Sequence, residues 1–170
     1  MNSSSIKRGI CAWLACCALI VSGLGCGGSD PLSTLAKANE RNIQRLSNLY
    51  LSFHSLNDWR GPNDEEEFKA FLREMRPERL RRIGIEPAEV DQIFINERDG
   101  EPFKVRYGVP GSMMGSSDPV IFEATGVNGK RMVGFLNMVQ REVDNTEYER
   151  LWSGDYTKED LSPDGDTRRP

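Results

Sequence analysis

Few side chains in this sequence belong to the types that usually carry out enzymatic chemistry. His54 is the only histidine, and the four cysteines, Cys11, Cys16, Cys17 and Cys26, all lie in the first 26 residues. A Ser/His/acid or Cys/His site would have to use His54, which falls beside the apolar stripe of a predicted helix and is interpreted as a surface or boundary residue. A zinc site would lack ligands. The sequence therefore predicts no cofactor, no metal and no nucleophilic catalytic site.

Carboxylates are more abundant, but their positions fit structural roles. Residues 65–67 are consecutive glutamates in the first turn of a predicted helix, where the helix dipole favours negative charge. Glu86, Glu89 and Asp91 lie near a turn, and a small carboxylate-based hydrolase would have to use them. The acidic side chains near the C-terminus lack the 12-residue loop of a calcium site. A hydrolase is therefore the least favoured of the functions considered.

Two other groups of side chains are suited to binding. One is a basic cluster formed by Arg73, Arg76, Arg79, Arg81 and Arg82. It can meet anionic lipid head groups or an acidic partner, although interleaved glutamates also fit a solvated, partly ion-paired helix face. The other is Met113 and Met114 in a Gly/Ser-rich loop, which either form an adaptable contact surface or fill the core. The predicted partner surface comprises Arg73, Arg76, Arg79, Arg82, Met113 and Met114.

The composition limits the class of protein to which the chain can belong. Its 170 residues include 28% charged side chains, and the 22 basic and 26 acidic residues give a net charge of −4. These values are ordinary for a soluble globular domain. They exclude a multi-span membrane protein, a collagen-like chain and a strongly basic nucleic-acid binder.

The spacing of apolar residues predicts helices in the first half of the chain. A long helix with Ser33 as its N-cap is expected over residues 33–58, with a stripe that includes Phe53 and Leu56. Because this stripe is thin in the first half, that half is expected to stand off from the domain. Asn63 or Asp64 is expected to cap a second helix. After it come a short turn from residue 77 and a segment at residues 90–95 that fits either a helix or a strand.

From residue 99 onward the apolar pattern alternates with a period of two, which is typical of strands. Strands are expected over residues 103–107, 120–124 and 131–136, with a hairpin between the last two and a candidate fourth strand at residues 138–143. Thr146 is expected to cap a last short helix. The fold class is therefore α+β: a long N-terminal helix and short helices packed on a small antiparallel β-meander of three to four strands. A single domain over residues 33–153 and a disordered polar tail over residues 154–170 are expected.

This order of elements resembles the headpieces of type IV pilins and type II secretion pseudopilins. The segments that carry the resemblance are residues 38–46 (ANERNIQRL) and residues 98–103 (RDGEPF). The N-terminal methylation signature of pilins, with its glutamate in an apolar helix, is absent from this sequence. The resemblance implies, as an alternative function, a pseudopilin-like subunit of a secretion or pilus machine.

The N-terminus has the pattern of an export signal. Lys7 and Arg8 are followed by seventeen uncharged residues, 9–25. This run is shorter than the roughly 20 apolar residues of a membrane-spanning helix, so a cleaved signal peptide over residues 1–25 is favoured over a retained anchor helix. Residues 26–32 then read as a flexible tether.

The end of this segment, Ser22-Gly23-Leu24-Gly25-Cys26, resembles the lipobox of bacterial lipoproteins. The resemblance implies that Cys26 receives a diacylglyceryl group on its sulfur and, after cleavage, becomes the N-terminus of a chain carrying palmitate-type lipid. Gly25 matches the family pattern, whereas Gly23 stands where an aliphatic residue is usual. An ordinary secretory signal and lipidation of Cys16 are the alternatives.

Together these features predict where the protein is located better than what it does. By the same resemblance, Gly27 rather than aspartate after Cys26 implies the outer rather than the inner membrane. We expect a non-enzymatic, lipid-anchored protein of the bacterial cell envelope that faces the periplasm. Its domain would bind or scaffold another protein of the envelope, and no nucleic acid.

Overall fold

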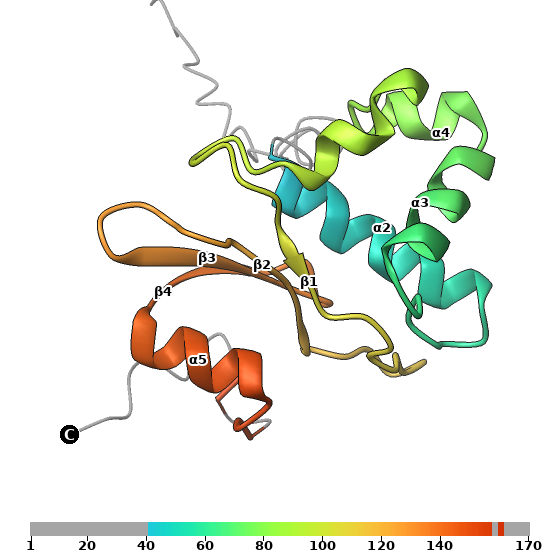
Figure 1. Cartoon of the computed structure of the whole chain (residues 1–170). Helices are drawn as coiled ribbons and strands as arrows, with labels where there is room; N and C mark the ends of the chain where they lie inside the picture. Colours follow the sequence, from blue (N-terminus) through green and yellow to red (C-terminus); the bar gives the residue numbers. More distant parts are fainter. Residues whose placement is uncertain (1–40, 158–159, 162–170) are drawn as a thin grey trace, which may run out of the picture.

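The computed structural model describes residues 41–157 and 160–161 (Figure 1). The predicted signal peptide, the tether, Cys26, the expected N-cap Ser33 and residues 162–170 lie outside the described residues. In chain order the elements are α2 (Asn42–Leu56), α3 (Glu65–Glu74), α4 (Pro77–Arg82), the 3₁₀ helix η1 (Pro87–Phe94), β1 (Lys104–Val105), β2 (Pro119–Phe122), β3 (Lys130–Phe135), β4 (Gln140–Asp144) and α5 (Asn145–Ser153). The predicted α+β class is confirmed.

The helix α2 differs from the expected long helix at its start. Arg41 has an extended backbone (φ −115°, ψ 154°), so the described helix begins at Asn42. The Asn42 side chain is buried and donates hydrogen bonds to the carbonyl oxygens of Gln92 (3.2 Å) and Ile95 (2.9 Å). Its backbone N–H donates to the Glu97 carboxylate at 2.8 Å. The first turn of α2 is therefore fixed to η1 and the loop after it, and does not stand off from the domain.

Local signals place the short helices. Asp64, one of the two residues predicted as the cap of this helix, is the N-cap of α3. It accepts a hydrogen bond from the Glu67 N–H at 2.8 Å. Pro77 occupies the first turn of α4, where its missing N–H costs nothing. The ambiguous residues 90–95 lie mostly in η1, a helix. Asp144 rather than Thr146 caps α5, because it accepts the Glu147 N–H at 2.8 Å.

The sheet is a four-stranded antiparallel meander with the order β1-β2-β3-β4. The predicted hairpin between the second and third strands is present, with Phe122 opposite Val133. The candidate fourth strand is also present as β4, which pairs Val143 with Arg131. All four residues of β2 are buried, because both faces of the sheet are covered.

The molecule has three layers (Figure 1). The helices α2, α3, α4 and η1 lie on one face of the sheet, and α5 lies on the other. In β3, Val133 and Phe135 pack in the cluster with α5, while Gly134 between them faces α2. A Cβ at Gly134 would overlap the Ser47 hydroxyl and approach Ile43 Cγ1 at 3.0 Å. This glycine therefore lets α2 lie directly on the sheet.

The described domain extends past the predicted boundary at residue 153. Tyr156 donates a hydrogen bond from its hydroxyl to Asp118 at 2.9 Å, and Leu161 is buried in the cluster beneath α5. Asp160 accepts a hydrogen bond from Arg150 at 3.0 Å. These residues were expected to belong to a disordered tail. The expectation was wrong here because one apolar residue, Leu161, docks a largely polar segment.

Candidate functional site

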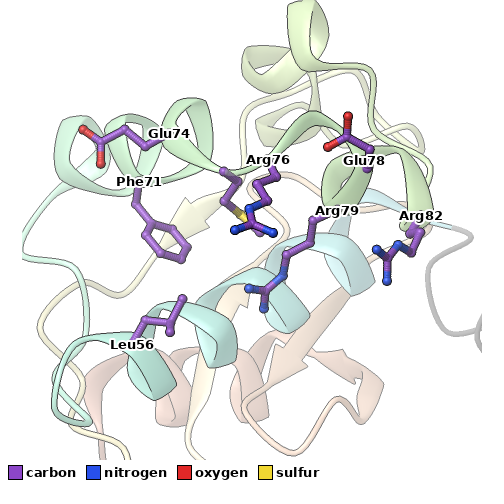
Figure 2. Close-up of a pocket in the computed structure, with 8 residues that line it drawn as sticks. Leu56, Phe71, Glu74, Arg76, Glu78, Arg79 and Arg82 are labelled. Carbon is purple, nitrogen blue, oxygen red and sulfur yellow. The ribbon is translucent and has the colours of Figure 1, made fainter.

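A groove lies where α4 faces the C-terminal half of α2 (Figure 2). Its volume is about 650 Å³. Three elements and their connections contribute the lining residues, which are Leu56, Phe71, Glu74, Met75, Arg76, Glu78, Arg79 and Arg82. Three of the six residues of the predicted partner surface therefore lie together at this one groove.

The apolar part of the groove consists of Leu56, Phe71 and Met75. Leu56 is 61% exposed, whereas Phe53, one turn earlier on the same helix, is 2% exposed. Phe53, one turn earlier, contacts the Phe71 ring with 5.0 Å between centroids. The helix α3 thus covers α2 as far as Phe53 and leaves most of the Leu56 surface exposed. The sequence placed Leu56 in the apolar stripe of the helix. Periodicity shows which face of a helix a residue lies on, but it does not show how far the neighbouring helix extends along that face.

The polar part of the groove is a row of arginines. Arg76, Arg79 and Arg82 are spaced three residues apart, so they lie on one side of the short helix α4. Within the described part of the chain, neither Arg76 nor Arg82 forms an ion pair, and the Arg79 side chain donates only to the Ser52 hydroxyl at 3.3 Å. Figure 2 shows the three guanidinium groups extending toward α2, whereas the carboxylate of Glu78 points away from them.

The other arginines of the predicted cluster have carboxylate partners. Arg73 Nη2 lies 2.9 Å from Asp91 Oδ1, and Lys69 Nζ lies 3.3 Å from the same oxygen. Arg81 Nε lies 3.4 Å from Glu86 Oε2. The interpretation as an ion-paired face therefore holds for Arg73 and Arg81, and not for the three arginines of the groove.

Met113 and Met114 are not part of this groove. Their side chains are 82% and 98% exposed, so neither fills the core. Met114 lines a second pocket of about 610 Å³, formed by the loop of residues 110–118 together with Tyr156 and Leu161. The two pockets share no lining residue. The structure therefore does not gather the predicted partner surface into a single site.

His54 is buried, with 1% of its surface exposed, which contradicts the expected surface or boundary position. Its Nε2 lies 2.9 Å from the Val109 carbonyl oxygen, so Nε2 carries the proton. Nδ1 has no hydrogen-bond partner among the described residues and is covered by Gly111. Burial lowers the pKa of His54, and the Val109 contact and Asp118 offset this only in part. With no hydroxyl or carboxylate bonded to it, this imidazole is part of the core and not of a triad.

The carboxylates considered for a hydrolase are exposed and point to no common site. Glu86 pairs with Arg81, while Asp91 pairs with Lys69 and Arg73. The Lys69 hydrogen bond, with help from Arg73, holds the pKa of Asp91 below its usual value, opposite to what a general acid requires. Among the described residues there is no group of three His, Cys, Asp or Glu side chains that could hold a metal ion.

Two further findings bear on the class of protein. Across residues 41–157 and 160–161, none of the helices combines the length and the apolar character needed to cross a membrane. When the chain was compared with protein-family models, with curated proteins and with solved structures, nothing matched it.

Proposed function

We propose that this protein is a lipid-anchored binding module of the bacterial cell envelope. One observation supports the binding role above all: an exposed leucine lies in a groove beside three arginines that form no ion pair with the described residues. An uncovered apolar side chain next to convergent polar groups is the common pattern of a partner site. The residues that line the groove include no serine, threonine, cysteine or histidine, so the proposal is a non-enzymatic one.

The anchor part of the proposal rests on Cys26 and the segment before it. Two or more acyl chains would hold the domain firmly at a bilayer, since each buried CH₂ contributes about 0.8 kcal/mol. The test is metabolic labelling with an alkyne-tagged palmitate in a bacterial host, followed by intact mass of the extracted protein. Cys26→Ala should lose the label, while the matched variant Cys16→Ala should keep it. Label that persists in Cys26→Ala would refute the anchor.

The binding part of the proposal predicts a partner at the groove in the native cell. A photo-crosslinking amino acid placed at Leu56 should give a discrete adduct, and Arg79→Glu in the same chain should remove it. The matched control is the same probe at Met138, which is 50% exposed and does not line the groove. Equal adducts at both positions, or none at Leu56, would contradict a partner at this site.

A pseudopilin-like subunit remains the second candidate. It is favoured by the packing of α2 on an antiparallel sheet, which is the architecture that the resemblance implies. It requires a retained N-terminal helix and copurification with a secretion or pilus machine. The intact mass described above separates the two candidates, since cleavage before Cys26 removes that helix.

A further inference from the structure

We infer that the groove binds an acidic protein segment that carries an apolar side chain, a conclusion that deepens the proposed function and rests on it. The argument starts from charge. The guanidinium groups of Arg76, Arg79 and Arg82 lie at one groove and form no ion pair with described residues. The chain as a whole carries a net charge of −4. An acidic partner is therefore repelled by most of the protein and attracted at this groove.

The geometry of the row also fits carboxylates. Arginine presents a planar fork of N–H donors that matches a carboxylate in a bidentate manner. Arg79 and Arg82 are three residues apart on α4, so they can engage two acidic side chains that are themselves neighbours on a short segment. The Arg79–Ser52 contact holds one of these guanidinium groups on the α2 side of the groove.

An apolar side chain of the same segment would meet Leu56, Phe71 and Met75. The exposed surface of Leu56 would be removed from water on binding, which is favourable. Met75 is half-buried in the groove, and its flexible thioether adapts to side chains of different shape. One aliphatic or aromatic side chain between two acidic ones satisfies both parts of the groove.

The same surface is poorly suited to an anionic membrane. A bilayer surface is broad, whereas the arginines line a groove whose apolar part lies between helices. Glu74 and Glu78 also line this groove, so its lining is of mixed charge and not uniformly basic. A narrow protein segment can contact the arginines without contacting the glutamates.

The test uses the mature, lipidated protein in neutral phosphatidylcholine nanodiscs and a library of random eight-residue peptides. We expect selected peptides to be enriched in aspartate or glutamate beside one aliphatic or aromatic residue. A defined probe follows: a labelled peptide with four glutamates around a central leucine, compared with peptides that carry four lysines or a central glycine. The glutamate–leucine peptide should bind at least about 10-fold more tightly than either, and its affinity should fall as salt rises.

Matched variants connect binding to the groove. Arg79→Glu with Arg82→Glu should weaken binding of the glutamate–leucine peptide at least about 10-fold. Arg73→Glu with Arg81→Glu makes the same change of charge at arginines outside the groove, and should weaken it by less than about 3-fold. Equal losses in the two pairs would reduce the effect to net charge and overturn the inference.

Three further outcomes would also overturn it: no acidic enrichment in the library, equal binding of the lysine peptide, or stronger binding to vesicles with 30% phosphatidylglycerol than to the acidic peptide. These failures are distinct from failure of the proposed function. A groove that takes a neutral or basic partner would still give the Leu56 photo-adduct, while the acidic probe would not bind.

Discussion

The buried carboxylate of Glu123 accepts a hydrogen bond from the Asn96 side-chain amide at 2.5 Å. Its other oxygen accepts the Met132 backbone N–H at 2.7 Å, and Arg98 Nε lies 3.4 Å from the first oxygen. Asn96 also donates to Asp99 at 2.8 Å. This cluster joins the loop after η1 to the β2–β3 hairpin, so it connects the helical layer that holds the groove to the sheet.

Glu123→Gln is expected to destabilise the fold by about 2–4 kcal/mol, because it leaves Arg98 without its buried carboxylate and turns an amide N–H₂ toward a donor. Urea unfolding measures the effect. The matched variant is Glu142→Gln, which removes the other carboxylate near Arg98, at 3.0 Å and 43% exposed. That change should cost less than about 1 kcal/mol. If the two variants lost similar amounts of unfolding free energy, burial of the Glu123 carboxylate would not be the cause of its contribution to stability.

The stability of the protein is expected to fall in mild acid because of His54. Burial lowers its pKa in the folded state below the ordinary value of 6.5. Below that pH the unfolded chain therefore binds a proton that the folded chain excludes, and the free energy of unfolding decreases by up to about 1.4 kcal/mol per pH unit. Above pH 7 this contribution is constant.

His54→Gln should remove this part of the pH dependence, since glutamine does not titrate and its amide can still donate to the Val109 carbonyl. The measurement is urea unfolding of both proteins between pH 7.5 and pH 5. His54 is the only histidine, so the slope that remains in the variant reports carboxylates alone. An unchanged slope in this range would show that the pKa of His54 is not lowered in the folded protein.

The contact between α2 and β3 predicts a steric effect at Gly134. Gly134→Ala should lower the free energy of unfolding by about 1–3 kcal/mol, because the added Cβ overlaps the Ser47 hydroxyl. Ser47→Ala should recover part of this loss by removing that oxygen, although Ile43 stays close. A double-mutant cycle measured by denaturant unfolding gives the coupling, expected at about 1 kcal/mol. Additive effects of the two changes would place the strain elsewhere.

The packing of the C-terminal segment predicts that Leu161 contributes to stability although it lies beyond the last helix. Leu161 is 8% exposed, and Leu161→Ala should cost about 2 kcal/mol. Leu56→Ala makes the same chemical change at a leucine that is 61% exposed, and should cost less than about 0.5 kcal/mol. Thermal unfolding of both variants decides between a docked segment and a free tail.

Tyr156→Phe tests the polar half of the same attachment. The tyrosine hydroxyl donates to Asp118 and accepts from Arg106 at 3.0 Å, so its removal should cost about 1 kcal/mol. The Thr157 N–H and the Arg150 guanidinium lower the pKa of Asp160 to about 2. Asp160 is therefore charged at every pH of these experiments, and its contact with Arg150 should not change with pH between 5 and 8.

The sequence alone determined the features that depend on neighbouring residues. Asp64 ahead of three glutamates marked the start of α3, and Pro77 marked α4, since a cap or a missing N–H acts within one turn. The period of two after residue 99 likewise gave the antiparallel meander and the fold class. The expectation of a lipid on Cys26 also comes from a short local segment, and it remains a prediction.

The tertiary structure decided everything that depends on what lies opposite a residue. Periodicity put both Phe53 and Leu56 on the buried face of one helix, yet α3 ends where it covers only the first. Arg73 and Arg76 looked equivalent in sequence, but only Arg73 lies near Asp91, eighteen residues away. An amino-acid pattern records the direction in which a side chain points. Whether it meets a partner, a core or an open groove is set by elements far away in the chain, and that is why the groove was visible only in the folded protein.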